Sequence, residues 1–398
     1  MAATFRRNVL LLAACQALFM TGTSMVITVT ALAGALCAPV ASLATLPLSL
    51  QFIATMATTV PASFIMRRFG RRAGFVIGAC AGGAGGVINV FALLANDFVL
   101  FCVGSSLIGV LAGFAVYYRF AAADCADDQT RSRAISWVMA GGVIAAFSGP
   151  NLARATADLL AGTSFAGTFA ALAALQVITI TLLFFVDIPR LSAEERKERG
   201  RPLGDILRQP AAFVAILGAV AGYSAMTLVM TATPLAVIGH NMRFGDAAFI
   251  IQWHVFAMFA PSFFTGSIVK RIGAVTVIGL GALLILSCVA INLHGTEKLH
   301  FVAALVALGL GWNFMFIGGT ALLTSVTARP EQAKVQGLND FLVFGFVALA
   351  SLSSGATYQA LGWQAVNLGA LPGIGLALLA ALWLGWSRRA GSLESTKA

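Results

Sequence analysis

Residues 63–72 read SFIMRRFGRR and turn the chain between two long apolar stretches. Four of these ten residues are arginines: Arg67, Arg68, Arg71 and Arg72. A basic cluster between two apolar segments has two interpretations. It is either a topology signal that keeps a turn in the cytoplasm, or part of a gate that opens and closes a path between the segments. The loop alone does not separate these alternatives.

The same pattern recurs in the second half of the chain. Residues 266–273 read GSIVKRIG, and they repeat the first loop at an offset of 203 residues: Arg67, Arg68 and Gly70 correspond to Lys270, Arg271 and Gly273. That offset also relates a second pair of loops: Asp128, Gln129 and Arg131 correspond to Glu331, Gln332 and Lys334. Two pairs of loops with one offset predict two copies of one structural unit.

The first loop resembles the signature G-x-x-x-D-R-x-G-R-R, which the major facilitator superfamily carries between its second and third membrane spans. The matching residues are Arg68, Gly70, Arg71 and Arg72, and in the second copy Gly266, Arg271 and Gly273. Ser63 replaces the first glycine, while Arg67 and Lys270 stand where the family has an aspartate. The resemblance implies a secondary transporter. The family's aspartate belongs to a charge relay that braces the inward-closed gate, and both copies of the loop lack it here.

Two further patterns of that family are only partly present. In the fifth span AAFSGPNLAR keeps Gly149 and Pro150 of the pattern G-x-x-x-G-P-x-x-G-G, which is associated with exporters of the antiporter type. The fourth span keeps Gly109 but has Ser105 in place of an arginine. These departures favour uptake over proton-driven drug export, and an exporter of drugs or metabolites remains the alternative.

The composition places the chain in a lipid bilayer. Of its 398 residues 59% are hydrophobic and 10% are charged, whereas a soluble domain carries roughly 25% charged residues. The net charge of +10 lies in short loops, which favours membrane orientation over nucleic-acid binding. The six cysteines show no CxxC spacing, so we expect neither a metal nor a cofactor.

The apolar stretches predict an all-α integral membrane protein with twelve transmembrane helices, arranged as two six-helix pseudo-repeats. Each stretch is long enough to cross about 30 Å of hydrocarbon. The first six are 9–34, 44–66, 74–95, 98–119, 134–158 and 165–186, and the second six are 211–237, 247–269, 274–293, 301–325, 338–360 and 368–387. We therefore expect bundles at 1–186 and 211–398, joined by a cytoplasmic linker at 187–210.

The basic residues predict the orientation. With the N-terminus in the cytoplasm, the loops on that side and the two termini hold 22 of the 25 lysines and arginines. The three exceptions are Arg154, Arg243 and Lys298. Such a bias predicts a protein of the inner membrane with both termini in the cytoplasm.

The substrate site of such a transporter is expected near the middle of the membrane, between the repeats. The resemblance implies that spans one, two, four, five, seven, eight, ten and eleven line it. Polar and aromatic residues at suitable depth on these spans are the candidates for substrate binding: Gln16, Gln51, Tyr223, Gln252, Trp253, His254, Trp312 and Asn313. The alternatives are helix–helix hydrogen bonds for the amides, a lipid-facing position for Trp253, and core packing for Trp312.

Two further residues, His254 and Arg119, bear on coupling and gating. His254 is the histidine that falls within a predicted span, and its titration range suits a proton as coupling ion. The alternative is a neutral imidazole bonded to a neighbouring helix. Arg119 follows Tyr117 and Tyr118 at the cytoplasmic end of span four, where it either closes an inner gate or obeys the charge bias.

The lack of acidic residues in the middle of the spans limits which substrate is expected. No Asp or Glu falls in the middle third of a predicted span, and Asp340 is placed at a span end. A fixed charge is expected opposite a charged solute in the membrane, so these residues favour a neutral or weakly charged solute with a flat apolar part. A vitamin such as riboflavin fits this description. No clustered His/Asp/Glu set or nucleophile–base pair indicates an enzyme, and we expect a monomer.

Overall fold

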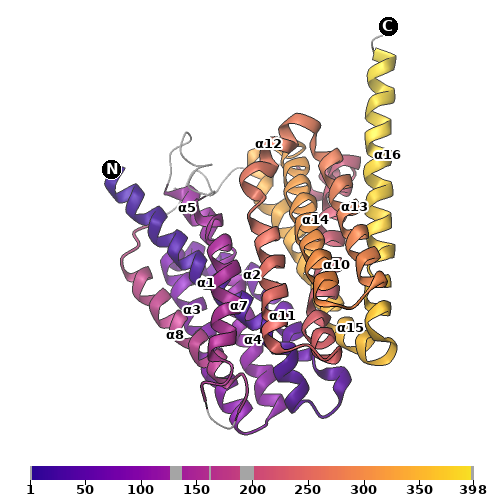
Figure 1. Cartoon of the computed structure of the whole chain (residues 1–398). Helices are drawn as coiled ribbons and strands as arrows, with labels where there is room; N and C mark the ends of the chain where they lie inside the picture. The colour runs from indigo at the N-terminus through magenta and orange to yellow at the C-terminus, as the bar shows by residue number, and fades with distance from the viewer. Residues whose placement is uncertain (1, 126–136, 161–162, 189–200, 396–398) are drawn as a thin grey trace.

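The computed structural model describes residues 2–125, 137–160, 163–188 and 201–395, and these form helices joined by short turns without any strand (Figure 1). The helices of the first half are α1 (Ala2–Cys37), α2 (Leu46–Phe69), α3 (Arg71–Leu94), α4 (Phe98–Ala115), α5 (Tyr118–Asp124), α7 (Gly141–Thr156) and α8 (Ala166–Phe184). Those of the second half are α9 (Leu203–Leu207), α10 (Pro210–Gly239), α11 (Phe244–Phe259), α12 (Ser262–Ile272), α13 (Ala274–His294), α14 (Lys298–Ser325), α15 (Arg329–Leu368) and α16 (Leu371–Ser395).

Twelve membrane-crossing segments, six in each half, follow from the helices in these ranges. Nine helical stretches are long and apolar enough to cross a membrane, and the bent pair α11–α12 makes a tenth. One of the nine, Lys334–Arg388, contains both α15 and α16, which reverse direction at a turn near Gly369. The twelfth is α7, with 16 described residues. The predicted all-α membrane fold is thus confirmed. The start of the predicted span 134–158 and Asp128, Gln129 and Arg131 lie outside the described residues.

Local sequence signals set the ends of these helices. Pro47 and Pro210 stand in the first turns of α2 and α10, where the missing N–H of proline has no intrahelical partner to lose. The carboxylate of Asp97 accepts a hydrogen bond of 3.0 Å from the Leu100 N–H and so caps α4. Each end is therefore fixed by chemistry within a few residues.

The repeated loops have the same backbone conformation. Gly70 ends α2 with φ 93° and ψ 156°, and Gly273 ends α12 with φ 84° and ψ 150°. In each case the glycine N–H donates to a carbonyl four residues earlier, Met66 or Val269, at 2.9 Å. Only glycine adopts this region readily. The offset of 203 residues therefore relates two equivalent structures.

Glycines also set the close approach of helices within each half. A Cβ at Gly85 would lie 2.6 Å from the Gly104 carbonyl oxygen, where α3 packs on α4. A Cβ at Gly281 would lie 2.7 Å from the Gly311 carbonyl oxygen, where α13 packs on α14. Small residues permit such contacts in lipid, where apolar burial gives helices no preference for one another over lipid.

Both chain ends lie at the same end of the molecule, at the top of Figure 1. We call this end the terminal side and the opposite end the far side. Within α16, large apolar side chains such as Leu379 and Trp386 are exposed, which suits a helix that faces lipid.

Candidate functional site

A cavity of about 230 Å³ lies between the two halves. Its walls come from α1, α2, α4, α5 and α7 in the first half and from α10, α11, α14 and α15 in the second. Among the described residues, α3, α8, α13 and α16 contribute no side chain to it. The lining helices belong to the spans that the sequence resemblance implied.

The second half gives the cavity an aromatic wall, formed by Tyr223, Phe259, Trp312 and Phe316. The rings of Trp312 and Phe316 stack at a centroid distance of 5.1 Å and an angle of 10°. Tyr223 meets the Trp312 ring edge-on at 4.9 Å. Trp312 is buried, and its indole Nε1 has no hydrogen-bond partner among the described residues. The wall therefore brings four aromatic side chains to the cavity, and the indole N–H of Trp312 is unpaired within it.

The first half gives the cavity amide and hydroxyl groups, including Gln16, Thr23 and Ser24 from α1 and Gln51 and Thr55 from α2. The side chains of Gln16 and Gln51 are buried at 6% and 3% exposure. Gln51 Oε1 and Ser24 Oγ have no partner. Buried polar atoms are normally hydrogen-bonded, so these two atoms are unpaired groups in residues that line the cavity.

A pair of opposite charges joins the halves at the terminal-side end of the cavity. Arg119 Nη2 of α5 lies 3.7 Å from Asp340 Oδ2 of α15, and both side chains line the cavity with 22% and 18% exposure. Helix α15 begins at Arg329, and its membrane-spanning stretch begins at Lys334. Asp340 lies about 9 Å into that stretch at 1.5 Å per residue, near its terminal-side end, where the sequence places it.

The far side of the cavity is closed by contacts between the halves. Phe165 and Phe244 pack edge-to-face at 5.2 Å, and Ser49 Oγ lies 3.1 Å from Ser351 Oγ. The Asn151 amide donates to Gln252 Oε1 at 2.7 Å. Ala31, Leu32, Ala44 and Leu235 bury their side chains together in the same region. A solute held in the cavity is thus separated from the far side.

The prediction that Tyr223, His254, Trp312 and Asn313 converge on one cavity holds for Tyr223 and Trp312, and it is wrong for the other two. His254 is fully buried, and its Nδ1 lies 2.7 Å from the Leu305 carbonyl oxygen. This contact turns the imidazole toward α14. The interpretation of His254 as a bond to a neighbouring helix describes its position.

The side chain of Asn313 forms its hydrogen bonds at the bend between α11 and α12. Pro261 lacks an N–H to continue the helix, and the two helices meet at 44°. The Asn313 amide donates to the Met258 carbonyl and to Ser262 Oγ, and Thr265 Oγ1 donates to its Oδ1, each at 2.7 Å. These bonds leave the side chain no free group for a solute.

Gln252 and Trp253 lie on the outside of the cavity wall, where α11 meets α7. Gln252 Oε1 accepts the hydrogen bond from Asn151. The ring centroid of Trp253 lies 6.3 Å from that of Phe147 and 5.6 Å from that of Phe256. Neither side chain lines the cavity. Both connect the halves beside it.

The predicted gating residues occupy several places. Arg119 lines the cavity. Arg67, Arg68 and Arg72 are exposed on the terminal side, with the Arg72 guanidinium 5.3 Å from the centre of the Phe184 ring. Arg71 and Gly70 border a shallow groove between α3 and the end of α8. In the second half Lys270 and Arg271 are exposed at the end of α12.

Gly149 and Pro150 belong to the interface between α7 and α1. Both residues are buried, and a Cβ at Gly149 would lie 2.5 Å from Ser24 Cβ. Gly149 therefore keeps α7 close to the helix that carries Ser24, and it acts on the cavity only through that neighbour.

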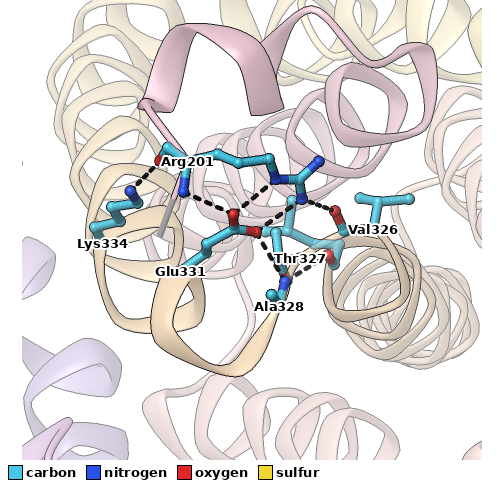
Figure 2. Close-up of polar contacts among 7 residues, drawn as sticks. Arg201, Val326, Thr327, Ala328, Glu331 and Lys334 are labelled. Atoms are coloured by element: carbon cyan, nitrogen blue, oxygen red, sulfur yellow. Dashed lines mark hydrogen bonds and ion pairs between the residues drawn. The ribbon is translucent and has the colours of Figure 1, made fainter. Parts of the chain in front are cut away.

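The linker is tied to the loop before α15 by the carboxylate of Glu331, as Figure 2 shows. Glu331 is only 2% exposed and accepts hydrogen bonds from the Arg201 N–H, the Arg201 guanidinium and the Ala328 N–H, at 2.7–2.9 Å. Lys334 Nζ donates to the Arg201 carbonyl. Arg201 and the backbone N–H groups lower the pKa of Glu331 to about 2, so this contact stays charged at physiological pH.

Sequence reasoning did not single out Phe259, Phe316 and Asn339 of the cavity lining. The one available signal was that Phe316 follows Trp312 by four residues, a spacing that puts two side chains on one helix face. Phe259 and Asn339 carry no such signal. Phe259 is one of 29 phenylalanines spread over the chain.

Two six-helix halves around a cavity that is closed on one side are the architecture of a membrane transporter. The sequence pattern that describes the Major Facilitator Superfamily matches residues 9–291. The riboflavin transporter RfnT of Brucella anthropi is 42% identical over 376 residues, which are 94% of each chain. The uncharacterized MFS-type transporter YddS of Bacillus subtilis is 31% identical and covers 73% of this chain and 70% of its own.

The fold also resembles that of solved transporters. The E. coli xylose transporter XylE, solved in a partially occluded inward-open conformation, superposes with a TM-score of 0.72 over 97% of this chain and 98% of its own, at 14% identity. The chain belongs to the major facilitator superfamily. It is a multi-pass membrane transporter of a small molecule and not an enzyme.

Proposed function

We propose that this chain takes up riboflavin, or a flavin of the same ring system, through the cavity between its halves. The observation that carries the proposal is the aromatic wall, in which the stacked Trp312 and Phe316 and the edge of Tyr223 offer a flat apolar surface. The 42% identity to a protein named as a riboflavin transporter, over 94% of both chains, supports the same substrate. The cavity's amides and hydroxyls suit the heteroatoms of an uncharged ring.

Uptake tests this proposal directly. A bacterium that cannot make riboflavin and lacks its own carrier is given this chain, and labelled riboflavin is followed inside the cells. We expect saturable accumulation that unlabelled riboflavin suppresses and that unrelated vitamins do not. Membrane-inserted protein without riboflavin uptake contradicts the substrate, and faster loss of riboflavin from preloaded cells assigns an exporter instead.

We also propose that the terminal side is the cytoplasmic side of the inner membrane. The support is the distribution of charge, with 22 of 25 lysines and arginines in the loops and termini on that side. A reporter enzyme that is active only in the periplasm, fused after Arg201, is expected to stay inactive. The same reporter fused after Lys298 is expected to be active, and the reverse pattern contradicts the orientation.

Transport is proposed to proceed by rocking of the halves 1–186 and 211–398 about the cavity, with 187–210 as the linker and one chain as the working unit. The basic loops Arg67–Arg72 and Lys270–Arg271 act as paired gating elements at the terminal side. A proton is the proposed coupling ion. If Arg71→Ala with Arg72→Ala leaves transport unchanged at normal membrane abundance, only the topological role of the loop survives.

A further inference from the structure

The charged pair at the terminal-side end of the cavity has unused hydrogen-bonding capacity. The Arg119–Asp340 separation of 3.7 Å exceeds the roughly 2.7–2.9 Å of a charge-assisted hydrogen bond. Within the part of the chain that the structure describes, Arg119 Nε is buried without a hydrogen-bond partner. Asp340 Oδ1 accepts one bond of 3.2 Å, from the Asn339 amide. All three side chains line the cavity, so a loosely paired guanidinium, a carboxylate and an amide stand together at this end of it.

The aromatic wall adjoins this pair. Tyr223 lines the same cavity as Arg119 and Asp340, and its ring centroid lies 4.9 Å from that of Trp312 and 5.7 Å from that of Phe316. The cavity therefore places an apolar ring surface beside a neutral pair of opposite charges. Such a combination is suited to a solute with a flat ring and a hydroxylated chain.

Two buried groups deeper in the cavity suit the edge of the ring. Gln51 Oε1 accepts and Trp312 Nε1 donates, and neither has a partner among the described residues. Both side chains are 3% exposed. An unpaired buried polar group destabilises the empty cavity, so a solute whose ring edge carries an N–H and carbonyl oxygens relieves that cost if it bonds to these groups.

We propose that Arg119, Asn339 and Asp340 bind the hydroxylated chain of the substrate, while its ring lies against Trp312 and Phe316 with its polar edge toward Gln51. This orientation rests on the proposed function. Hydroxyl groups donate to the Asp340 carboxylate and accept from the Arg119 guanidinium and the Asn339 amide. A phosphate at the end of the chain meets the Asp340 carboxylate, so Asp340 also selects against the phosphorylated flavin.

The test compares two flavins on the purified full-length protein. Riboflavin carries the hydroxylated chain, whereas lumiflavin has the same ring with a methyl group in its place. Binding is followed by quenching of flavin fluorescence in the wild type, Asp340→Asn, Asn339→Ala and Trp312→Ala. The matched control is Asp246→Asn, whose carboxylate pairs with Lys298 away from the cavity at 2.7 Å.

We expect Asp340→Asn and Asn339→Ala each to raise the Kd for riboflavin by about tenfold, the effect of one lost charge-assisted or buried hydrogen bond. The Kd for lumiflavin changes less than about twofold, and Trp312→Ala weakens both flavins. Asp340→Asn also binds the phosphorylated flavin more tightly than the wild type does, because Arg119 is freed. The control variant binds like the wild type.

The orientation is overturned if Asp340→Asn and Asn339→Ala weaken both flavins equally or neither. Unchanged riboflavin binding with lost accumulation in Asp340→Asn also overturns it and makes Asp340 a site of proton coupling instead. If Asp340→Asn does not purify as a folded protein, Asn339→Ala decides alone. If the wild type binds neither flavin, the proposed function itself is contradicted. This result differs from those that overturn only the orientation, because in those the wild type still binds riboflavin.

Discussion

The two halves of this transporter share their loops but differ in the walls that they give to the cavity. Gly70 and Gly273 adopt the same conformation, 203 residues apart. At the same offset Gln51 lines the cavity, whereas His254 turns to the backbone of α14. The first half offers amides and hydroxyls, and the second offers the aromatic wall. Repetition thus preserves what the fold needs, and divergence between the copies makes the site.

The largest effect is expected where the halves differ most. Trp312→Ala removes the stacked face of the aromatic wall, and base-like rings lose about 1–3 kcal/mol when such a face is removed. Affinity for riboflavin then falls roughly 5- to 150-fold. The control is Trp386→Ala, because Trp386 is 72% exposed on α16. Equal losses in both variants would assign the effect to stability.

The repeated loops are expected to respond alike. Gly70→Ala and Gly273→Ala each place a side chain at positive φ with ψ near 150°, which costs on the order of 1–3 kcal/mol. A Cβ at either position meets no atom within 4 Å, so the cost is purely conformational. The thermal midpoints of the two variants in detergent should fall by similar amounts, and a loss in only one would break the equivalence of the loops.

The equivalent positions Gln51 and His254 are expected to respond differently. Gln51→Ala removes a free acceptor from the cavity and should weaken riboflavin binding by about 2- to 10-fold, the worth of one hydrogen bond. His254→Gln changes a group that bonds the Leu305 carbonyl outside the cavity, so the Kd and the accumulation from pH 5.5 to 8 should match the wild type. Accumulation that is lost in His254→Gln would restore its predicted role in proton coupling.

The smallest effect concerns pH at the linker. The depressed pKa of Glu331, about 2 against an ordinary 4.5, means that its bond to Arg201 stabilises the protein above pH 4.5 and is lost as the pH falls through about 2. Proteolysis of the linker should therefore be constant from pH 5.5 to 8. Glu331→Gln should speed cleavage within residues 187–210, with Glu297→Gln as the control on the far side. A rate that varies with pH in the wild type would contradict the assignment.

Sequence reasoning reached the parts of this protein that depend on local properties. Apolar length and loop charge gave twelve spans and the two halves, because a span is recognised from about twenty consecutive residues. The equivalence of Gly70 and Gly273 was also visible in the sequence, because a backbone conformation that only glycine adopts readily requires glycine at the same position of both copies. Gln16, Gln51, Tyr223 and Trp312 were placed in the cavity by depth and residue type.

The rest depended on which way each helix faces. His254 and Asn313 have the depth of a binding residue, but one turns to the Leu305 carbonyl and the other holds the break at Pro261. Asp340 lies near the end of its span, and only the assembled structure brings it next to Arg119 in the cavity. The chain by itself determined that there are twelve membrane spans in two similar halves. Only tertiary packing decided which polar groups meet in the cavity, because a helix's rotation is fixed by its neighbours and not by its own sequence.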